Sequence, residues 1–171
     1  MTKRPGVRMA WKELYVYWRD HHVDGRPPAR ADIDPPLHVP RLLPNVMLID
    51  FVGGRFRMRL AGSELIRRRG HDNTGQPIDP EIMPDRGVPT FVAFLERVVE
   101  TRAPVVYSVS QSDVTAFGAT GILLPLVDRA DKVEMILGGV FYETNRVSGL
   151  HDVWIPGTLT QLSLSELLDE D

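Results

Sequence analysis

Histidines and acidic residues that could bind a metal lie close together near the N-terminus. This stretch contains Asp20, His21, His22 and Asp24. Adjacent side chains on a helix point about 100° apart, so His21 and His22 cannot easily share one ion. The chain has no cysteine, which excludes disulfides, zinc–thiolate sites, iron–sulfur ligation by cysteine and a cysteine nucleophile. We therefore expect a solvated helix end and no metal site.

The sequence lacks the common motifs of nucleophilic catalysis and of phosphate binding. It contains no G-x-S-x-G elbow, no G-x-x-x-x-G-K-[ST] loop and no G-x-G-x-x-G turn. Asp32 and Asp34 precede a pair of prolines, which favours a linker over a cation site. His71 is expected to satisfy its loop by hydrogen bonding. Asp50, within the strand pattern VMLIDFV, is the residue that an enzyme built on this chain would use as a base.

Arginines form the one basic concentration of the chain. They are Arg55, Arg57 and Arg59, followed by Arg67, Arg68 and Arg69. An anionic partner, such as a nucleotide or an acidic protein face, could use them. The alternative, which we favour, is that the strand arginines face solvent and that the helix arginines stabilise the C-terminus of their helix through its dipole.

The N-terminal part of the chain predicts a helix followed by a linker. In residues 9–22 a stripe of large apolar side chains follows the i, i+3, i+4, i+7 spacing of one helical face. The stripe consists of Trp11, Leu14, Tyr15 and Trp18. The proline-rich residues 25–44 predict an extended, stiff segment.

The middle of the chain predicts a sheet crossed by one helix. The segments VMLIDFV and RFRMRLA flank Gly53–Gly54, which predicts two strands joined by a hairpin turn. The second strand alternates, so Phe56, Met58 and Leu60 are expected on one side. Residues 88–102 have the strongest helical period, and strands are expected at 104–112, 121–128 and 132–143. Hairpin connections favour one antiparallel five-stranded sheet with helices on one face, an α+β fold. The tail is expected to be looser and to end in a short helix.

Apolar side chains from the second hairpin strand and the helices converge between sheet and helix. They are Phe56, Met58, Leu65, Phe91, Phe94, Leu95 and Val98. Such a set is ordinarily core, and it becomes a ligand site only where the packing leaves a void. We name these residues as the candidate ligand-binding set.

Length and charge restrict the class of protein. A chain of 171 residues corresponds to one domain with extensions, and its net charge of −3 argues against a dedicated nucleic-acid binder. No apolar run is long enough to span a bilayer, and no signal core follows the N-terminal basic residues. We expect a cytoplasmic protein with neither a membrane nor a nucleic acid as partner.

The order and spacing of these elements in residues 45–144 resemble a PAS domain. The resemblance rests on the opening hairpin, the segment LAGSELIRRRGHDNTGQPI, the 88–102 helix and the segment LPLVDRADKVEMILGGVFYET. The stretches RLAGS, GHDNTG and ILLPL resemble small stand-alone bacterial PAS proteins, common in alphaproteobacteria. The resemblance divides the chain into an N-terminal helix and linker (1–44), a PAS-like domain (45–144) and a tail (145–171).

The resemblance implies a sensory or protein-interaction domain in signal transduction, without catalysis. A small ligand would bind between sheet and helices, and the N-terminal stripe would build a homodimer. No cofactor is expected, because the chain lacks the cysteine of flavin-adduct sensors and a histidine on the 88–102 helix for haem. A noncovalently bound flavin is the option that stays open. Alternatives are a small cone-shaped isomerase or hydratase using Asp50, or a ligand-free scaffold.

Overall fold

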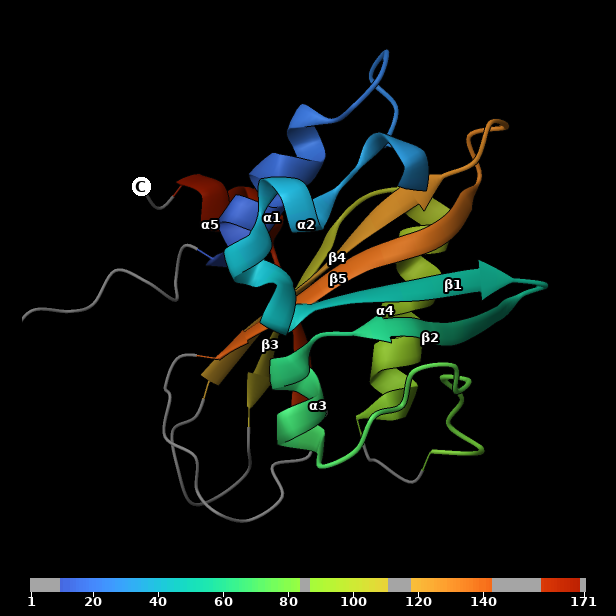
Figure 1. Ribbon diagram of the computed structural model, residues 1–171, viewed down its shortest axis with the longest axis vertical. Coiled ribbons are helices and arrows are strands. Elements are labelled where there is room, and N and C mark those ends of the chain that lie inside the picture. Colours follow the sequence, from blue (N-terminus) through green and yellow to red (C-terminus); the bar gives the residue numbers. More distant parts are fainter. Residues whose placement is uncertain (1–9, 84–86, 111–117, 143–157, 170–171) are drawn as a thin grey trace, which may run out of the picture.

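The protein is an α+β fold built on one antiparallel sheet. The computed structural model describes residues 10–83, 87–110, 118–142 and 158–169. Its sheet has six strands in the order β2-β1-β5-β4-β3-β6. Helix α1 lies in front of the sheet and α4 behind it in the view of Figure 1. Within these residues, no helix is long and apolar enough to cross a membrane.

The elements follow one another along the chain with short connections. The strands are β1 (Val46–Val52), β2 (Arg55–Ala61), β3 (Val105–Ser110), β4 (Gly118–Val127), β5 (Val133–Tyr142) and β6 (Thr158–Leu162). The α-helices are α1 (Ala10–Asp20), α2 (Pro35–His38), α3 (Ser63–Arg69), α4 (Val88–Thr101) and α5 (Leu164–Asp169). Two 3-10 turns, η1 (Arg30–Asp32) and η2 (Pro40–Asn45), flank α2.

The β1–β2 hairpin forms as its glycines predict, with one irregularity. Gly53 and Gly54 have φ values of 60° and 75°, which suit a two-residue turn. Met58 pairs with Ile49 but Leu60 pairs with Leu48, so one strand holds an extra residue. The predicted alternation therefore ends at Met58, and Leu60 is 45 % exposed instead of buried.

The proline-rich segment 25–44 is not the extended linker that its composition suggested. It folds into η1, α2 and η2. Prolines occupy the first positions of α2 and η2, where a backbone N–H would have no partner within the helix, so proline is tolerated there. The Asp32 carboxylate accepts from Ala29 N at 2.9 Å, and that of Asp34 accepts from Leu37 N at 3.3 Å. Both acids therefore cap short helices.

The stripe of α1 packs on the sheet of its own chain. Trp11, Leu14 and Trp18 are buried there, whereas Tyr15 is half-buried. Trp18 donates its indole N–H to the carbonyl of Pro125 at 2.8 Å, across the outer face of β4. Tyr17, outside the predicted stripe, is also buried, and its hydroxyl accepts a hydrogen bond from Asp34 N at 2.7 Å.

The tail adds a sixth strand to the sheet that the sequence pattern predicted as five-stranded. Strand β6 pairs antiparallel with β3, Thr160 lying opposite Ser108. Its sequence, TLTQL, is too short to stand out as a strand, and a long-range partner decides its conformation. Helix α5 follows, and its leucines pack against the cluster beneath α1.

Helix α4 covers the opposite face of the sheet, close to its predicted bounds. Its buried side, which includes Phe91, Leu95 and Val98, follows the helical period of the sequence. The helix ends at Thr101 because Arg102 adopts a left-handed conformation with φ 51° and closes the last turn. The antiparallel pairing of β3 with β4 confirms the hairpin topology.

Removing one indole from α1 tests whether this helix belongs to the core. We expect Trp18→Ala to lower the free energy of unfolding by about 3–5 kcal/mol, the usual cost of deleting a buried aromatic side chain. The matched variant Val16→Ala, on the exposed side of α1, should change it by less than about 0.5 kcal/mol. Urea titration followed by tryptophan fluorescence measures both, and equal effects would contradict this packing.

Candidate ligand-binding region between the sheet and helix α4

The structure brings the candidate ligand-binding set together in one buried cluster. Strand β2, helix α3 and helix α4 contribute its members. The set is Phe56, Met58, Leu65, Phe91, Phe94, Leu95 and Val98. None is more than 9 % exposed, so these side chains form the interior between sheet and α4. The predicted meeting of these side chains in one cluster is thus observed, while ligand binding by them stays a prediction.

Tyr107 of β3 is the central residue of this interior that sequence reasoning missed. Its ring packs against Phe91 and Phe94, with centroids 6.1 Å and 5.4 Å apart. Burial, and to a smaller extent the nearby Tyr142, raises the pKa of the Tyr107 hydroxyl above its ordinary value. Tyr107 therefore stays neutral and presents a phenol hydroxyl inside an apolar space.

A glycine on the neighbouring strand makes room for the Tyr107 ring. Gly121 lies directly opposite Tyr107 in the β3–β4 register. A Cβ atom at this position would collide with the far end of that ring. A glycine inside a strand often marks such a close approach, but the sequence could not reveal the register that pairs the two residues.

The three consecutive arginines of α3 have different environments. Arg68 is buried, its Nε lies 2.7 Å from Oε1 of Glu64, and its guanidinium stacks 3.7 Å from the Tyr142 ring. Arg67 lies more in solvent and binds the same carboxylate at 2.6 Å. Hydrogen bonding by Arg67, and then by Arg68, lowers the pKa of Glu64 against the opposing effect of burial. Arg69 is half-buried and donates from Nε to Nε2 of His71 at 2.9 Å. The basic run is thus a helix end in which Arg68 is the most buried of the three cations.

Asn73 adds a second buried polar group after α3. Its side chain is 5 % exposed, and its Nδ2 has no hydrogen-bond acceptor among the described residues. A buried donor without a partner costs about 1–3 kcal/mol, so water or a ligand would be favoured beside it. Neither Asn73 nor Tyr107 carried a motif that would have marked it in the sequence.

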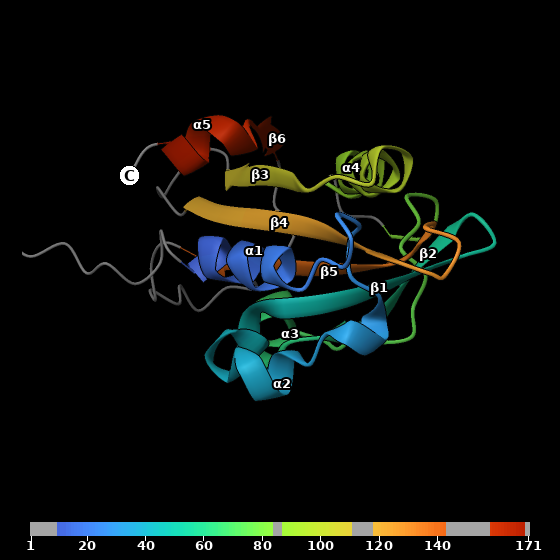
Figure 2. The same cartoon turned by 90° about the horizontal axis from the view of Figure 1, so that it is seen from above.

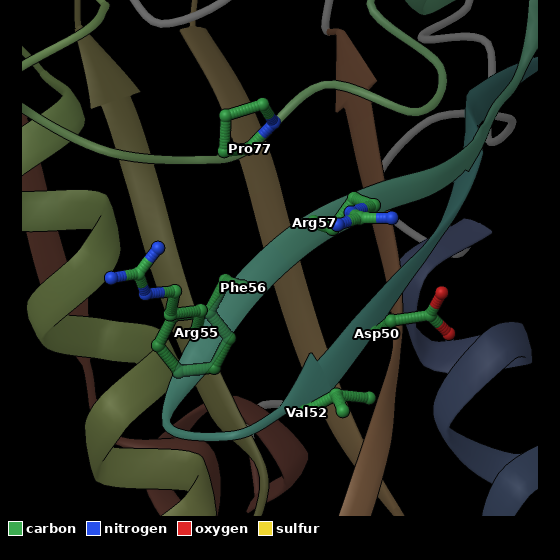
Figure 3. Close-up of a pocket in the computed structure, with 6 residues that line it drawn as sticks. All are labelled: Asp50, Val52, Arg55, Phe56, Arg57 and Pro77. Atoms are coloured by element: carbon green, nitrogen blue, oxygen red, sulfur yellow. The ribbon is translucent and has the colours of Figure 1, made fainter.

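A concave feature lies on the β1–β2 hairpin, outside the predicted set except for Phe56 (Figure 3). This hollow has a volume of 360 Å³, and its lining comprises Asp50, Val52, Arg55, Phe56, Arg57 and Pro77. The Asp50 carboxylate points away from α4 in the close-up and lies 3.4 Å from Nη1 of Arg59. Asp50 is therefore an ion-paired residue of the outer face and lies outside the buried interior.

The N-terminal histidines contact aromatic rings of α1. His22 stacks edge-on against Trp18 with centroids 4.3 Å apart. His21 and His38 both approach the Tyr17 ring, at 4.5 Å and 5.6 Å between centroids. In the described part of the chain, no group of three or more histidine, cysteine or acidic side chains could hold a metal ion. These histidines tie α1 to the segment that follows it.

An antiparallel sheet crossed by one helix, with a buried interior between them, defines the class of this α+β domain. The chain matches the PAS domain family over residues 7–141 and belongs to that family. No curated protein matches the chain. The match begins before α1, so it includes the helix and segment that the resemblance over 45–144 had set apart.

The contact between Gly121 and Tyr107 predicts a strong coupling of these residues. We expect Gly121→Ala to destabilise the protein by about 1–3 kcal/mol, since the added methyl overpacks the core. In the Tyr107→Leu background the same change should cost clearly less, because the colliding ring is gone. A double-mutant cycle by urea unfolding measures the difference, and additive effects would show that the ring is not the obstacle.

The lowered pKa of Glu64 predicts an acid-dependent loss of stability. This carboxylate titrates below its ordinary 4.5 in the folded protein, so it stabilises the fold above that pH. The contribution should disappear as the pH falls through the folded-state pKa. Unfolding titrations between neutral pH and about pH 4 and below should show a flatter profile for Glu64→Gln and for Arg67→Gln. An unchanged profile in both variants would contradict the assignment.

Proposed function

We propose that this PAS domain is a non-catalytic sensory and protein-interaction module of bacterial signalling in the cytoplasm, which takes a small ligand between the sheet and α4. Membership of the family supports a sensory or interaction domain in general. The observation that carries the ligand proposal is the chemistry of the buried interior. Apolar side chains surround it, Tyr107 is buried among them, and Arg68 stacks on Tyr142, which packs against them. Asn73, in the loop after α3, is a further buried polar side chain.

This arrangement favours a ligand with an apolar body and one hydrogen-bond acceptor. Ligand pockets are generally apolar and contain a few polar groups that fix orientation. The phenol of Tyr107, the guanidinium of Arg68 and the amide of Asn73 are all donors, whereas the carboxylate of Glu64 already binds two arginines. A ligand would occupy space that the Tyr107 ring now fills, so binding requires that this ring moves. In the ligand-free alternative the ring stays and the domain is a scaffold.

The enzyme alternative depends on Asp50 and is the weaker candidate. A general base is most effective when burial raises its pKa towards neutrality and its substrate lies within hydrogen-bond reach. Asp50 lies beside a hollow on the hairpin, which favours this reading, but Arg59 pairs with it and its carboxylate retains access to solvent. We infer a role in hairpin stability.

Signal output would occur through self-association or docking that depends on the ligand. The homodimer stays a prediction, and its proposed interface was Trp11, Leu14, Tyr15 and Trp18. In a single chain three of these side chains already cover the sheet, and Tyr15 keeps the most access to solvent. A dimer of this chain would therefore need a contact surface other than the stripe.

Native mass spectrometry of the freshly purified chain tests the ligand proposal. We expect a bound small molecule that is released on denaturation and is lost in Arg68→Gln, because this variant removes a buried donor. The neighbouring variant Arg67→Gln, at a more exposed site, should retain it. Thermal unfolding checks that both variants are folded.

The same preparation tests the other parts of the proposal. Absence of any bound mass would favour the scaffold. A Soret band would contradict the expectation of no haem, and a flavin absorption band would indicate a noncovalently bound flavin. A substrate whose conversion collapses in Asp50→Asn would overturn the non-catalytic assignment.

A further inference from the structure

The two edges of the sheet are protected to very different degrees. Residues 75–78 run along the free edge of β2 and form backbone hydrogen bonds to Met58 and Phe56 of 2.6–3.0 Å. Pro77 lies opposite Arg57 in an isolated bridge, and β2 has the extra residue of the hairpin. Proline, charged residues and bulges are the usual means by which proteins prevent edge pairing.

Strand β6, at the other edge, has none of these protections. It is the outermost strand, beside β3, in the view from above (Figure 2). Among the described residues, only β3 pairs with it. Its sequence TLTQL and the SLS that follows contain no charged residue, proline or glycine. The side chains of Thr160 and Gln161 are exposed. An edge of this kind is a template for another strand.

We propose that β6 pairs antiparallel with β6 of a second copy of this chain, which joins the two sheets across a twofold axis. In the register centred on Thr160, Thr160 faces its own copy and Leu159 faces Gln161. Every cross-strand pair is then free of charge, so no like charges oppose one another at the axis. A charged partner strand would find no complementary charge on β6.

The position of β6 also connects this edge to both cores. Leu159 packs against the buried interior that contains Tyr107, and Leu162 packs against the cluster beneath α1. Leu159 lies opposite Val109, two residues along β3 from Tyr107. A ligand that displaces the Tyr107 ring would therefore act on the strand that holds β6. This inference rests on the proposed self-association, but it does not require that a ligand exists.

Charge substitution at the axis provides a test with an internal rescue. In the 171-residue chain, Thr160→Lys and Thr160→Glu each place like charges opposite one another in the pair of copies. In sedimentation velocity, we expect the wild type to form more dimer as its concentration rises. Each variant should raise the dimer dissociation constant at least about tenfold, which corresponds to roughly 1.4 kcal/mol. An equal mixture of the two variants should recover dimers, because lysine then faces glutamate.

Matched variants separate this surface from others. Gln76→Lys adds the same charge at the protected edge and should leave the dimer unchanged. Circular dichroism and thermal unfolding verify that each variant is folded. A dimer that survives both Thr160 variants but dissociates in Val16→Lys, on the exposed side of α1, would overturn the β6 interface. A wild type that stays monomeric at every concentration would also overturn it, while leaving the ligand proposal to its own test.

Discussion

The sheet of this protein has to be covered on both faces, and the rest of the fold depends on that constraint. Strands β4 and β5 are buried along almost their whole length, with side chains of both faces excluded from water. Burial of one such side chain contributes about 1.5–3 kcal/mol, so an uncovered face would leave the domain unstable. Helix α4 covers one face, and α1 with α5 covers the other. The N-terminal helix is therefore part of the structural unit.

The connection between α1 and β1 serves the same requirement. The segment 25–44 does not hold α1 at a distance, because its short helical turns pack beneath it and beside β1. Tyr17 fixes the arrangement by accepting a hydrogen bond from Asp34 N while its ring contacts His21 and His38. The family match likewise begins ahead of α1.

The interior beneath α4 combines an apolar lining with polar groups that are expensive to bury. Arg68 is neutralised by Glu64 and stacks on Tyr142, and Tyr107 stays uncharged. Fully hydrophobic side chains of similar volume would often be as stable as such an ion pair. The presence of Arg68, Glu64 and Tyr107 in or beside this interior agrees with the ligand-binding role proposed above. Strand β3 contains Tyr107 and pairs with β6 at the sheet edge.

Local patterns in the sequence determined the elements whose structure depends on nearby residues. Gly53–Gly54 specifies a turn, the period of Phe91, Leu95 and Val98 specifies α4, and the apolar spacing of residues 9–22 specifies α1, because backbone preference and amphipathicity act over a few residues. The apolar set around Phe56 and Phe94 could likewise be predicted, since the buried side of each element is readable from its own period.

Tertiary structure decided which distant segments meet. The stripe of α1 covers its own sheet, Arg68 turns inward while Arg67 is more exposed, and Tyr107 lies over Gly121. Strand β6 forms only because β3 offers it an edge. Each of these outcomes depends on strand register or helix placement between residues far apart in the chain. Such placement is set by the packing of the whole core, and no local period encodes it.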